Sequence, residues 1–171
     1  MKIEDVIGDY KKLYKDLISD IKDLGIDTSN LYVDHFCFRT SSLKNYEVKK
    51  VELFQLSDWF LENIHNNRPI SKFILKEPLV FENQRVSIIE LPAPKVGVSY
   101  KDGIEHFEFV VGKNFTEFKN KYSHLWTGQD DSGEFNKPVY IKLKSGVVKF
   151  HEKPLDEVIR LEGNKFIKVI L

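Results

Sequence analysis

The stretch IEHFEF at Ile104–Phe109 decides the fold, because it repeats an earlier phrase of the chain, VDHFCF at Val33–Phe38. Each phrase reads aliphatic residue, acid, His, Phe, any residue, Phe, so His35 and His106 occupy the same place in the two phrases. Successive side chains of a strand point to opposite faces, so both phrases predict strands with phenylalanines on one face and histidine on the other. A strand phrase that recurs within one chain indicates a duplicated module.

The residues that follow each phrase repeat the same plan. In the first half we expect a helix over about Tyr46–Asn63, a turn at HNNRP and strands at ISKFILK and RVSIIEL. In the second half, FTEFKNKYSHL is typical of a shorter helix, and PVYIKLKSGVVKFHE predicts a hairpin that turns at Ser145-Gly146. PLDEVIRLEG reads as a closing helix and NKFIKVIL as a terminal paired strand. The segment PAPKVGVSYKDG, rich in Pro and Gly, marks the internal boundary.

These elements predict an α+β fold in which two βαβββ-type modules form a curved mixed sheet around a shared cavity. An extra N-terminal helix is expected ahead of them, because hydrophobic residues recur at spacings of three and four up to Leu24. We expect a single domain over residues 1–171, with the N-terminal helix at 1–25, the modules at 31–94 and 103–160, and a C-terminal tail at 161–171.

The composition excludes several classes of function. Lys and Arg number 26, as do Asp and Glu, so the formal net charge is zero and nucleic acid is not an expected partner. With Cys37 as the one cysteine, neither an intramolecular disulfide nor a cysteine-rich zinc site can form. No apolar run is long enough for a signal peptide or a membrane span. We therefore expect a cytoplasmic protein that does not bind membranes.

The last strand of each half ends in a residue that can bind a metal. Aligning Val86 with Val147 matches Glu90 with His151. An alternative alignment on the prolines that follow these strands matches Glu90 with Glu152 instead. We prefer His151, because the alternative turns the apolar face of the strand toward the cavity.

Four residues are therefore predicted to face the cavity, namely His35, Glu90, His106 and His151. Imidazole and carboxylate ligands together suit zinc, iron(II), nickel, manganese or cobalt. A catalytic metal also needs an open position for the substrate, and three or four protein ligands leave one. The pattern predicts a divalent metal site. Asp34 and Glu105, beside the two histidines, are expected to face the other way, as surface or helix-contact residues.

Further polar residues are expected on the cavity side. Arg39 is either a clamp for a substrate carboxylate or half of a salt bridge, and Arg68 either contacts the substrate from the rim or lies in a surface turn. Lys149 either stabilises an anionic intermediate or reaches solvent. Glu108 is either a general base or a partner for Arg39, and Glu90 is a second candidate for moving the proton.

The segments DHFCFR, NRPISKFILKEP, SIIELPAP, EHFEFV and VVKFHEKPLDEVI together resemble the YecM-like family of the vicinal oxygen chelate superfamily. That superfamily includes glyoxalase I, extradiol dioxygenases and the bleomycin-resistance proteins. The resemblance covers residues 31–159 and implies a metal-binding protein similar in structure to isomerases and oxidoreductases. The ligands it implies fall on His35, Glu90, His106 and His151. The short second-half helix and the loop at 127–138 depart from a regular repeat.

The leading functional hypothesis is a divalent-metal-dependent enzyme that chelates vicinal oxygens of a small metabolite and stabilises an enediolate or oxyanion. Isomerase, epimerase or lyase chemistry fits this description, and an iron(II) oxygenase is a further option. The expected partner is an oxygenated or carboxylate-bearing small molecule. The alternative hypothesis is a non-catalytic metal-binding or small-ligand-binding protein of the same fold.

Overall fold

The structure is a computed structural model that describes residues 1–170, and these residues divide into two units. The first unit contains residues 1–10, 35–105 and 165–170, and the second contains residues 11–34 and 106–164. The chain passes from one unit to the other inside two strands, β1 (Tyr32–Arg39) and β5 (Gly103–Val110).

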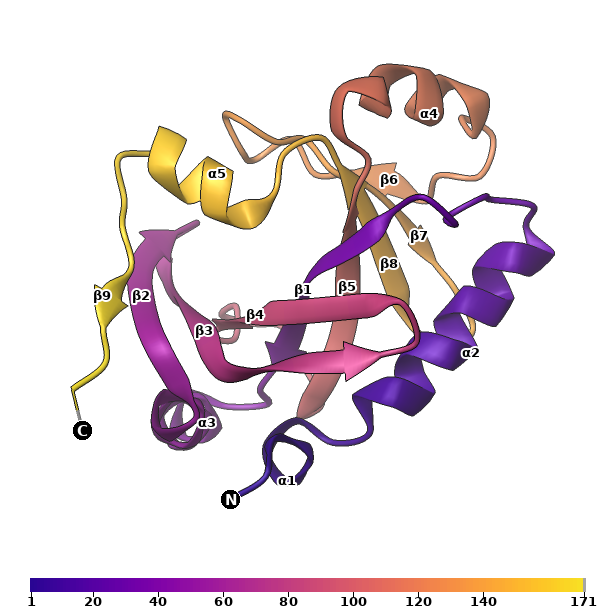
Figure 1. Cartoon of the computed structure of the whole chain (residues 1–171). Coiled ribbons are helices and arrows are strands. Elements are labelled where there is room, and N and C mark those ends of the chain that lie inside the picture. The colour runs from indigo at the N-terminus through magenta and orange to yellow at the C-terminus, as the bar shows by residue number, and fades with distance from the viewer. Residues whose placement is uncertain (171) are drawn as a thin grey trace. The chain divides into compact units, whose positions relative to one another are not determined.

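The first unit has the predicted βαβββ order. After β1 it contains α3 (Leu43–Gln55), β2 (Ser57–His65), β3 (Arg68–Phe81), β4 (Gln84–Pro92) and the short C-terminal strand β9 (Ile167–Lys168). The strands lie in the order β1-β4-β3-β2-β9, as Figure 1 shows, and β9 pairs with the outer edge of β2. β1 runs parallel to β4, whereas the pairs β4–β3 and β3–β2 are antiparallel. The predicted terminal strand is therefore confirmed.

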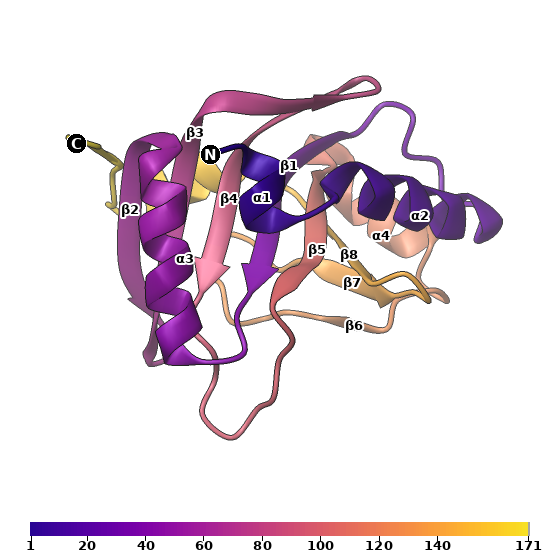
Figure 2. The same ribbon diagram turned by 90° about the horizontal axis from the view of Figure 1, so that it is seen from below.

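Helix α3 covers one face of this sheet, where Figure 2 shows it lying along β2. Tyr46 and Leu53 of the helix are fully buried. The hydroxyl of Tyr46 donates to Glu62 on β2 at 2.5 Å and lies 2.8 Å from the hydroxyl of Ser71 on β3. The opposite face carries Cys37, which lies opposite Glu90 of β4.

The helix predicted over Tyr46–Asn63 is wrong at its C-terminal end. α3 stops at Gln55, and the chain from Ser57 forms β2, so the aromatic pair Trp59-Phe60 lies in a strand. Pairing with β3 along almost the whole of β2 outweighs the helical pattern. The predicted turn at HNNRP makes this pairing possible, because Asn66 and Asn67 adopt φ angles of 51° and 59° and close a tight hairpin.

The second unit repeats the βαβββ order. After β5 come a 3-10 turn (Gly112–Asn114), α4 (Phe115–Lys121), β6 (Gly128–Gln129), β7 (Val139–Lys142), β8 (Val147–His151) and α5 (Leu155–Leu161). The strands lie in the order β6-β7-β8-β5, and β5 is parallel to β8. The predicted hairpin and closing helix are confirmed, and together the two units confirm the α+β fold class.

Aromatic rings fill the core of the second unit. Phe107, Phe109 and Phe150 are fully buried, and the rings of Phe109 and Phe150 stack at 5.5 Å. Helix α2 packs on the same face through Tyr14, whose ring lies 5.5 Å from that of Phe107. Trp126 follows α4 and also contacts Phe150. The phenylalanines of the repeated phrase thus lie on the packed face, and the opposite face of β5 is left to polar residues.

The N-terminal segment forms two helices rather than the one expected up to Leu24. α1 spans Ile3–Ile7 and α2 spans Tyr10–Asp23, and Gly8 between them has a φ of 84°. A positive φ ends a helix, and glycine adopts it without strain. Over residues 1–170, no helix has both the length and the apolar character that crossing a membrane requires.

Candidate metal centre

Four polar residues share one face of β5 and β8 in the second unit. The strand register places Glu108 opposite Lys149 and Val110 opposite His151, and His106 lies two residues before Glu108. Residues at even spacing on paired strands point the same way, so all four polar side chains lie on the face opposite the phenylalanines. His106 and His151 are each 1% exposed and Glu108 is 6% exposed. The face therefore carries buried ionisable groups instead of a second apolar layer.

The carboxylate of Glu108 is the centre of this group. Its Oε1 lies 3.1 Å from His106 Nε2 and 3.0 Å from Lys149 Nζ, and its Oε2 lies 3.6 Å from His151 Nε2. A buried carboxylate is costly unless positive charge and hydrogen bonds compensate it. Lys149 and His106, which approach Oε1, provide part of that compensation.

One hydrogen bond decides which nitrogen of His151 faces the carboxylates. His151 Nδ1 lies 2.7 Å from the carbonyl oxygen of Lys153. A carbonyl oxygen can only accept, so Nδ1 donates and the lone pair of the neutral ring is on Nε2. Asn136 holds this carbonyl in place, since its side chain donates to Lys153 O at 2.6 Å and accepts from Lys153 N at 3.0 Å.

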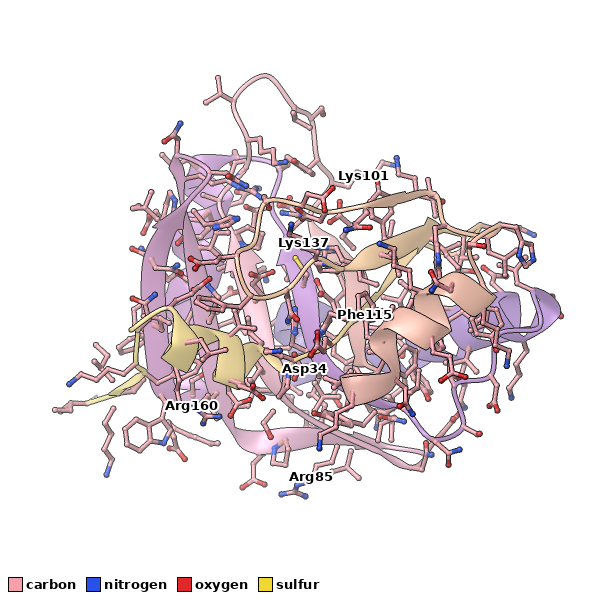
Figure 3. All side chains as sticks on the ribbon, turned by 90° about the horizontal axis from the view of Figure 1, so that it is seen from above. Asp34, Arg85, Lys101, Phe115, Lys137 and Arg160 are labelled. Atoms are coloured by element: carbon pink, nitrogen blue, oxygen red, sulfur yellow. The ribbon has the colours of Figure 1, made fainter. Side chains whose placement is uncertain are left out.

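Asp34 is a second carboxylate near His151, and the sequence prediction did not include it in the site. Asp34 is 9% exposed, and its Oδ2 lies 3.7 Å from His151 Nε2. The same oxygen accepts a hydrogen bond at 2.9 Å from the backbone of Leu155, where α5 begins, so the expected helix contact is present. Figure 3 labels Asp34 among the inner side chains. Because α5 follows β8 after only three residues, a contact with the start of α5 also brings Asp34 to His151.

The residue types of this donor set, two imidazoles and two carboxylates, are ones that divalent transition metals accept. Ligand atoms bound at 2.0–2.2 Å to one ion lie about 2.8–3.6 Å apart. His106 Nε2 lies 3.1 Å from Glu108 Oε1, and His151 Nε2 lies 3.6 Å from Glu108 Oε2 and 3.7 Å from Asp34 Oδ2. With Nδ1 protonated, the Nε2 lone pair of His151 faces two carboxylates. A cation beside Nε2, either a proton or a metal ion, would offset the repulsion between this lone pair and the two carboxylates.

The strand registers correct the predicted match between the two halves. His35 lies opposite Ile88, as His106 lies opposite Val147. Glu90 therefore corresponds to Lys149, two residues before the predicted counterpart His151. A shift of two residues preserves the face of the strand, so His151 still shares the face of His106.

Glu152, the alternative partner in that match, points away from this face. It is exposed, and its carboxylate pairs with Lys153 at 3.0 Å.

In the first unit, the predicted residues also share one face. His35, Cys37 and Arg39 alternate along β1, and Glu90 on β4 lies opposite Cys37. His35 is 3% exposed and Cys37 is fully buried. Lys72 on β3 lies opposite Glu90 and is 5% exposed, although the sequence offered no reason to select it.

The two arginines of the first unit are held by short contacts. Arg39 Nε donates to Glu105 Oε2 at 2.6 Å, so the salt-bridge interpretation of Arg39 applies and Glu105 is its partner. Arg68 Nη1 donates to the carbonyl oxygen of Ala93 at 2.7 Å. Arg68 is part-buried rather than exposed in a surface turn.

Comparison with known protein families identifies one match over most of the chain. The family model described as "YecM protein" matches residues 2–147. A Haemophilus influenzae protein described as uncharacterized is 36% identical over 90 residues, which are 53% of this chain and 47% of that protein. Protein YecM of Escherichia coli K12 is 29% identical over 110 residues, 64% of this chain and 58% of that protein. The chain thus matches about half the length of these curated relatives.

A solved structure shares the fold. Protein EC4020 superposes with a TM-score of 0.77 at 24% identity, covering 93% of this chain and 92% of that chain. At this identity the similarity establishes a common fold and carries nothing about activity.

Proposed function

This chain belongs to the YecM protein family, and from the donor set around Glu108 we propose that it is a divalent-metal-dependent enzyme acting on a small oxygenated metabolite. His106, Glu108 and His151 would hold the ion, with Asp34 as a further carboxylate beside His151. Two imidazoles and one carboxylate leave positions for substrate oxygens. Zinc, iron(II), nickel and manganese all accept such ligands.

The single observation that carries the proposal is the orientation of His151. Its Nδ1 donates to Lys153 O at 2.7 Å, and its Nε2 faces carboxylate oxygens at 3.6 and 3.7 Å. Imidazoles that bind metals usually donate their second ring N–H to a carbonyl or carboxylate, which fixes the tautomer and the ring. The same ring without a cation would direct a lone pair at two negative groups.

The chemistry supported best is proton movement next to a polarised carbonyl. A bound divalent ion would supply a Lewis acid for the substrate carbonyl. Glu108 would take the proton, and the contacts of its two oxygens with His106, Lys149 and His151 support this role. The ammonium of Lys149 would balance the negative charge left on the substrate. An isomerase, epimerase or lyase reaction needs no more than these roles.

His35 and Glu90 were also predicted as ligands, and Glu90 as a proton carrier. They belong to the first unit, and their roles stay predictions. Substitutions His35→Ala and Glu90→Gln in the assay below test them one by one.

Metal content of the purified chain tests the proposal. Protein stripped by a chelator and reloaded with Zn²⁺, Mn²⁺, Ni²⁺ or Fe²⁺ should bind one ion per chain, measured by mass spectrometry of the metal. His151→Ala should weaken binding at least 10-fold. His124→Ala removes an exposed histidine of the same unit and should bind like the wild type.

Turnover then separates an enzyme from a binding protein. The loaded wild type should convert a member of a panel of dicarbonyls and 2-oxo acids, and Glu108→Gln should lower kcat at least 100-fold. Absence of bound metal would contradict the metal assignment. A loaded protein inactive on every compound of a broad panel would favour a non-catalytic binder.

A further inference from the structure

Two arginines lie at the same end of neighbouring strands in the sheet of the first unit. β1, β4 and β3 are neighbours in that order. Arg39 is the last residue of β1, Arg68 is the first residue of β3, and Ala93 directly follows β4. Since β1 and β4 are parallel and β3 is antiparallel to β4, these three chain positions lie at the same end of the three strands.

Both arginines also point to the same face as the buried polar residues of that sheet. Arg39 lies two residues after Cys37, which is opposite Glu90, and Arg68 lies four residues before Lys72, also opposite Glu90. Even spacing along paired strands keeps side chains on one face. The ends of three adjacent strands thus bring two guanidinium groups together beside a single carboxylate.

Each arginine keeps one buried nitrogen without a hydrogen bond. Arg39 uses Nε for Glu105, and its guanidinium lies 5.3 Å from the ring centre of Tyr100. Arg68 uses Nη1 for Ala93 O. Among the residues that the structure describes, Arg39 Nη1 and Arg68 Nε are buried and have no hydrogen-bond partner. A buried N–H that bonds to nothing destabilises a fold, and each of these arginines has one.

The charges around the pair point in the same direction. Burial lowers the pKa of Arg68, and the positive charge of Arg39 lowers it further, so the two groups lie close enough to repel. Burial acts against the charge of Arg39 as well, but Cys37 and Glu105 outweigh it and raise the pKa of that group. Arg39 is paired with the carboxylate of Glu105, whereas Arg68 Nη1 donates to a neutral carbonyl oxygen.

Lys72 adds a third cation to the face. It is 5% exposed, and its ammonium donates to Asn63 Oδ1 at 2.7 Å, again a neutral partner. Three cationic side chains thus share this face with Glu90, and Glu105 pairs with one of them, Arg39. A local excess of positive charge with open N–H donors is the usual composition of an anion site.

From this geometry we propose that Arg39 Nη1 and Arg68 Nε together bind the carboxylate group of a small organic ligand. One N–H from each arginine would donate to a different oxygen of the carboxylate. The planar shape of a carboxylate suits two guanidinium donors. The inference goes beyond the proposed function, because it adds a separate binding site for a small carboxylate ligand. It rests on residues of the first unit, so metal-free protein can test it separately.

NMR of arginine side chains measures this binding directly. The full chain, labelled with ¹⁵N and stripped of metal, is titrated with sodium propionate or with inorganic phosphate at constant ionic strength. Propionate has no second oxygen group next to its carboxylate, so it reports on the arginines rather than on a chelating site. The Nε–H signal of Arg68 should shift saturably with propionate, with a Kd of about 1–10 mM. Arg85, exposed on β4 and lying at the periphery in Figure 3, is the internal control and should not shift saturably.

A matched pair of substitutions tests whether propionate binds at Arg68 specifically. Arg68→Lys keeps the charge and removes the Nε–H donor, and it should weaken propionate binding at least 10-fold, followed through the signals of Arg39. Arg85→Lys is the same change at an exposed position of the same unit and should leave the Kd unchanged. Thermal unfolding of both variants shows that they fold.

The outcomes separate this inference from the metal proposal. Saturable propionate binding that Arg68→Lys weakens supports the carboxylate site, whatever the metal content. Saturation by phosphate alone would overturn the carboxylate assignment. No saturable shift with either anion, in a chain that binds one metal ion, would overturn the anion site and leave the proposed function standing.

Discussion

His151 donates from Nδ1 to the carbonyl oxygen of Lys153, 2.7 Å away, and so turns Nε2 toward the carboxylates of Glu108 and Asp34. That relationship connects the fold to the proposed chemistry. The carbonyl lies in the short link between β8 and α5. Asn136, from the loop before β7, donates to this carbonyl and accepts from the backbone N–H of the same residue, Lys153. The orientation of His151 therefore depends on the loop that contains Asn136, whose conformation sequence patterns do not predict.

Removal of Asn136 should weaken metal binding without touching a ligand. Asn136→Ala frees the carbonyl of Lys153, so His151 loses its fixed orientation, and the affinity for Zn²⁺ should fall about 10- to 100-fold. Competition with a chromophoric chelator measures the change. Asn120→Ala, an exposed asparagine on α4, is the control and should bind like the wild type. Equal affinities in both variants would show that the loop does not hold the site.

Lys149 should stabilise the metal-free protein more than the metal-bound one. Its ammonium lies 3.0 Å from Glu108 Oε1, and Lys149→Met leaves that buried carboxylate with less positive charge. We expect the metal-free variant to lose about 1–3 kcal/mol of unfolding free energy, because an undercompensated buried charge is costly. A bound divalent ion replaces the missing charge.

Thermal unfolding with and without Zn²⁺ checks this expectation. The Tm increase on adding Zn²⁺ should be larger for Lys149→Met than for the wild type. Lys142→Met, at an exposed position of the same hairpin, should show the wild-type increase. A smaller increase for Lys149→Met would mean that Lys149 assists metal binding instead of competing with it.

Acid should abolish the contribution of Glu62 to stability. Partial burial alone would raise the pKa of Glu62, but hydrogen bonds from Tyr46, Ser71 and Lys50 outweigh burial and lower it. A pKa lowered on folding stabilises the protein above the unfolded-state value and is lost as the pH falls through the folded-state value. The effect is thus present near pH 7, begins to decline near the unfolded-state pKa of about 4.3, and is lost as the pH falls through the lowered folded-state pKa.

Urea unfolding of Glu62→Gln tests the sign of this effect. At pH 7 the variant should lose about 1 kcal/mol, a value kept small by the partial exposure of Glu62. As the pH is lowered from 7 to 3, the difference in urea midpoint between the variant and the wild type should shrink. Glu77→Gln, exposed on β3, should differ little from the wild type at either pH. A difference that grows at low pH would contradict the hydrogen-bond account.

The sequence predicted most of the strands because their alternation is strong. The phrases around His35 and His106 fold as β1 and β5, with phenylalanines packed and histidines on the other face. The hairpin at Gly146 and the helix α5 were also recognisable from turn residues and periodicity. Trp59 was misassigned to a helix, since a run of large apolar residues fits both structures until its pairing partner is known.

Parts of the candidate site depend on contacts that a single sequence does not encode locally. The correspondence of Glu90 with Lys149 follows from strand register, which distant turns and the packing of whole faces determine. Asp34 was set aside on strand alternation, but its bond to the start of α5 brings it near His151. Lys72 could not be recognised from the sequence as a buried residue of this face, because a lysine between apolar residues of a strand usually indicates a solvent-exposed edge strand.

Diffraction from metal-loaded crystals, recorded at the absorption edge of the bound ion, tests the central claim most directly. The account predicts one anomalous peak about 2.0–2.3 Å from both His106 Nε2 and His151 Nε2, with Glu108 in the same coordination sphere. The bond from His151 Nδ1 to Lys153 O should be unchanged. A fully loaded crystal with its peak away from these residues, or with none beside His151, would contradict the account.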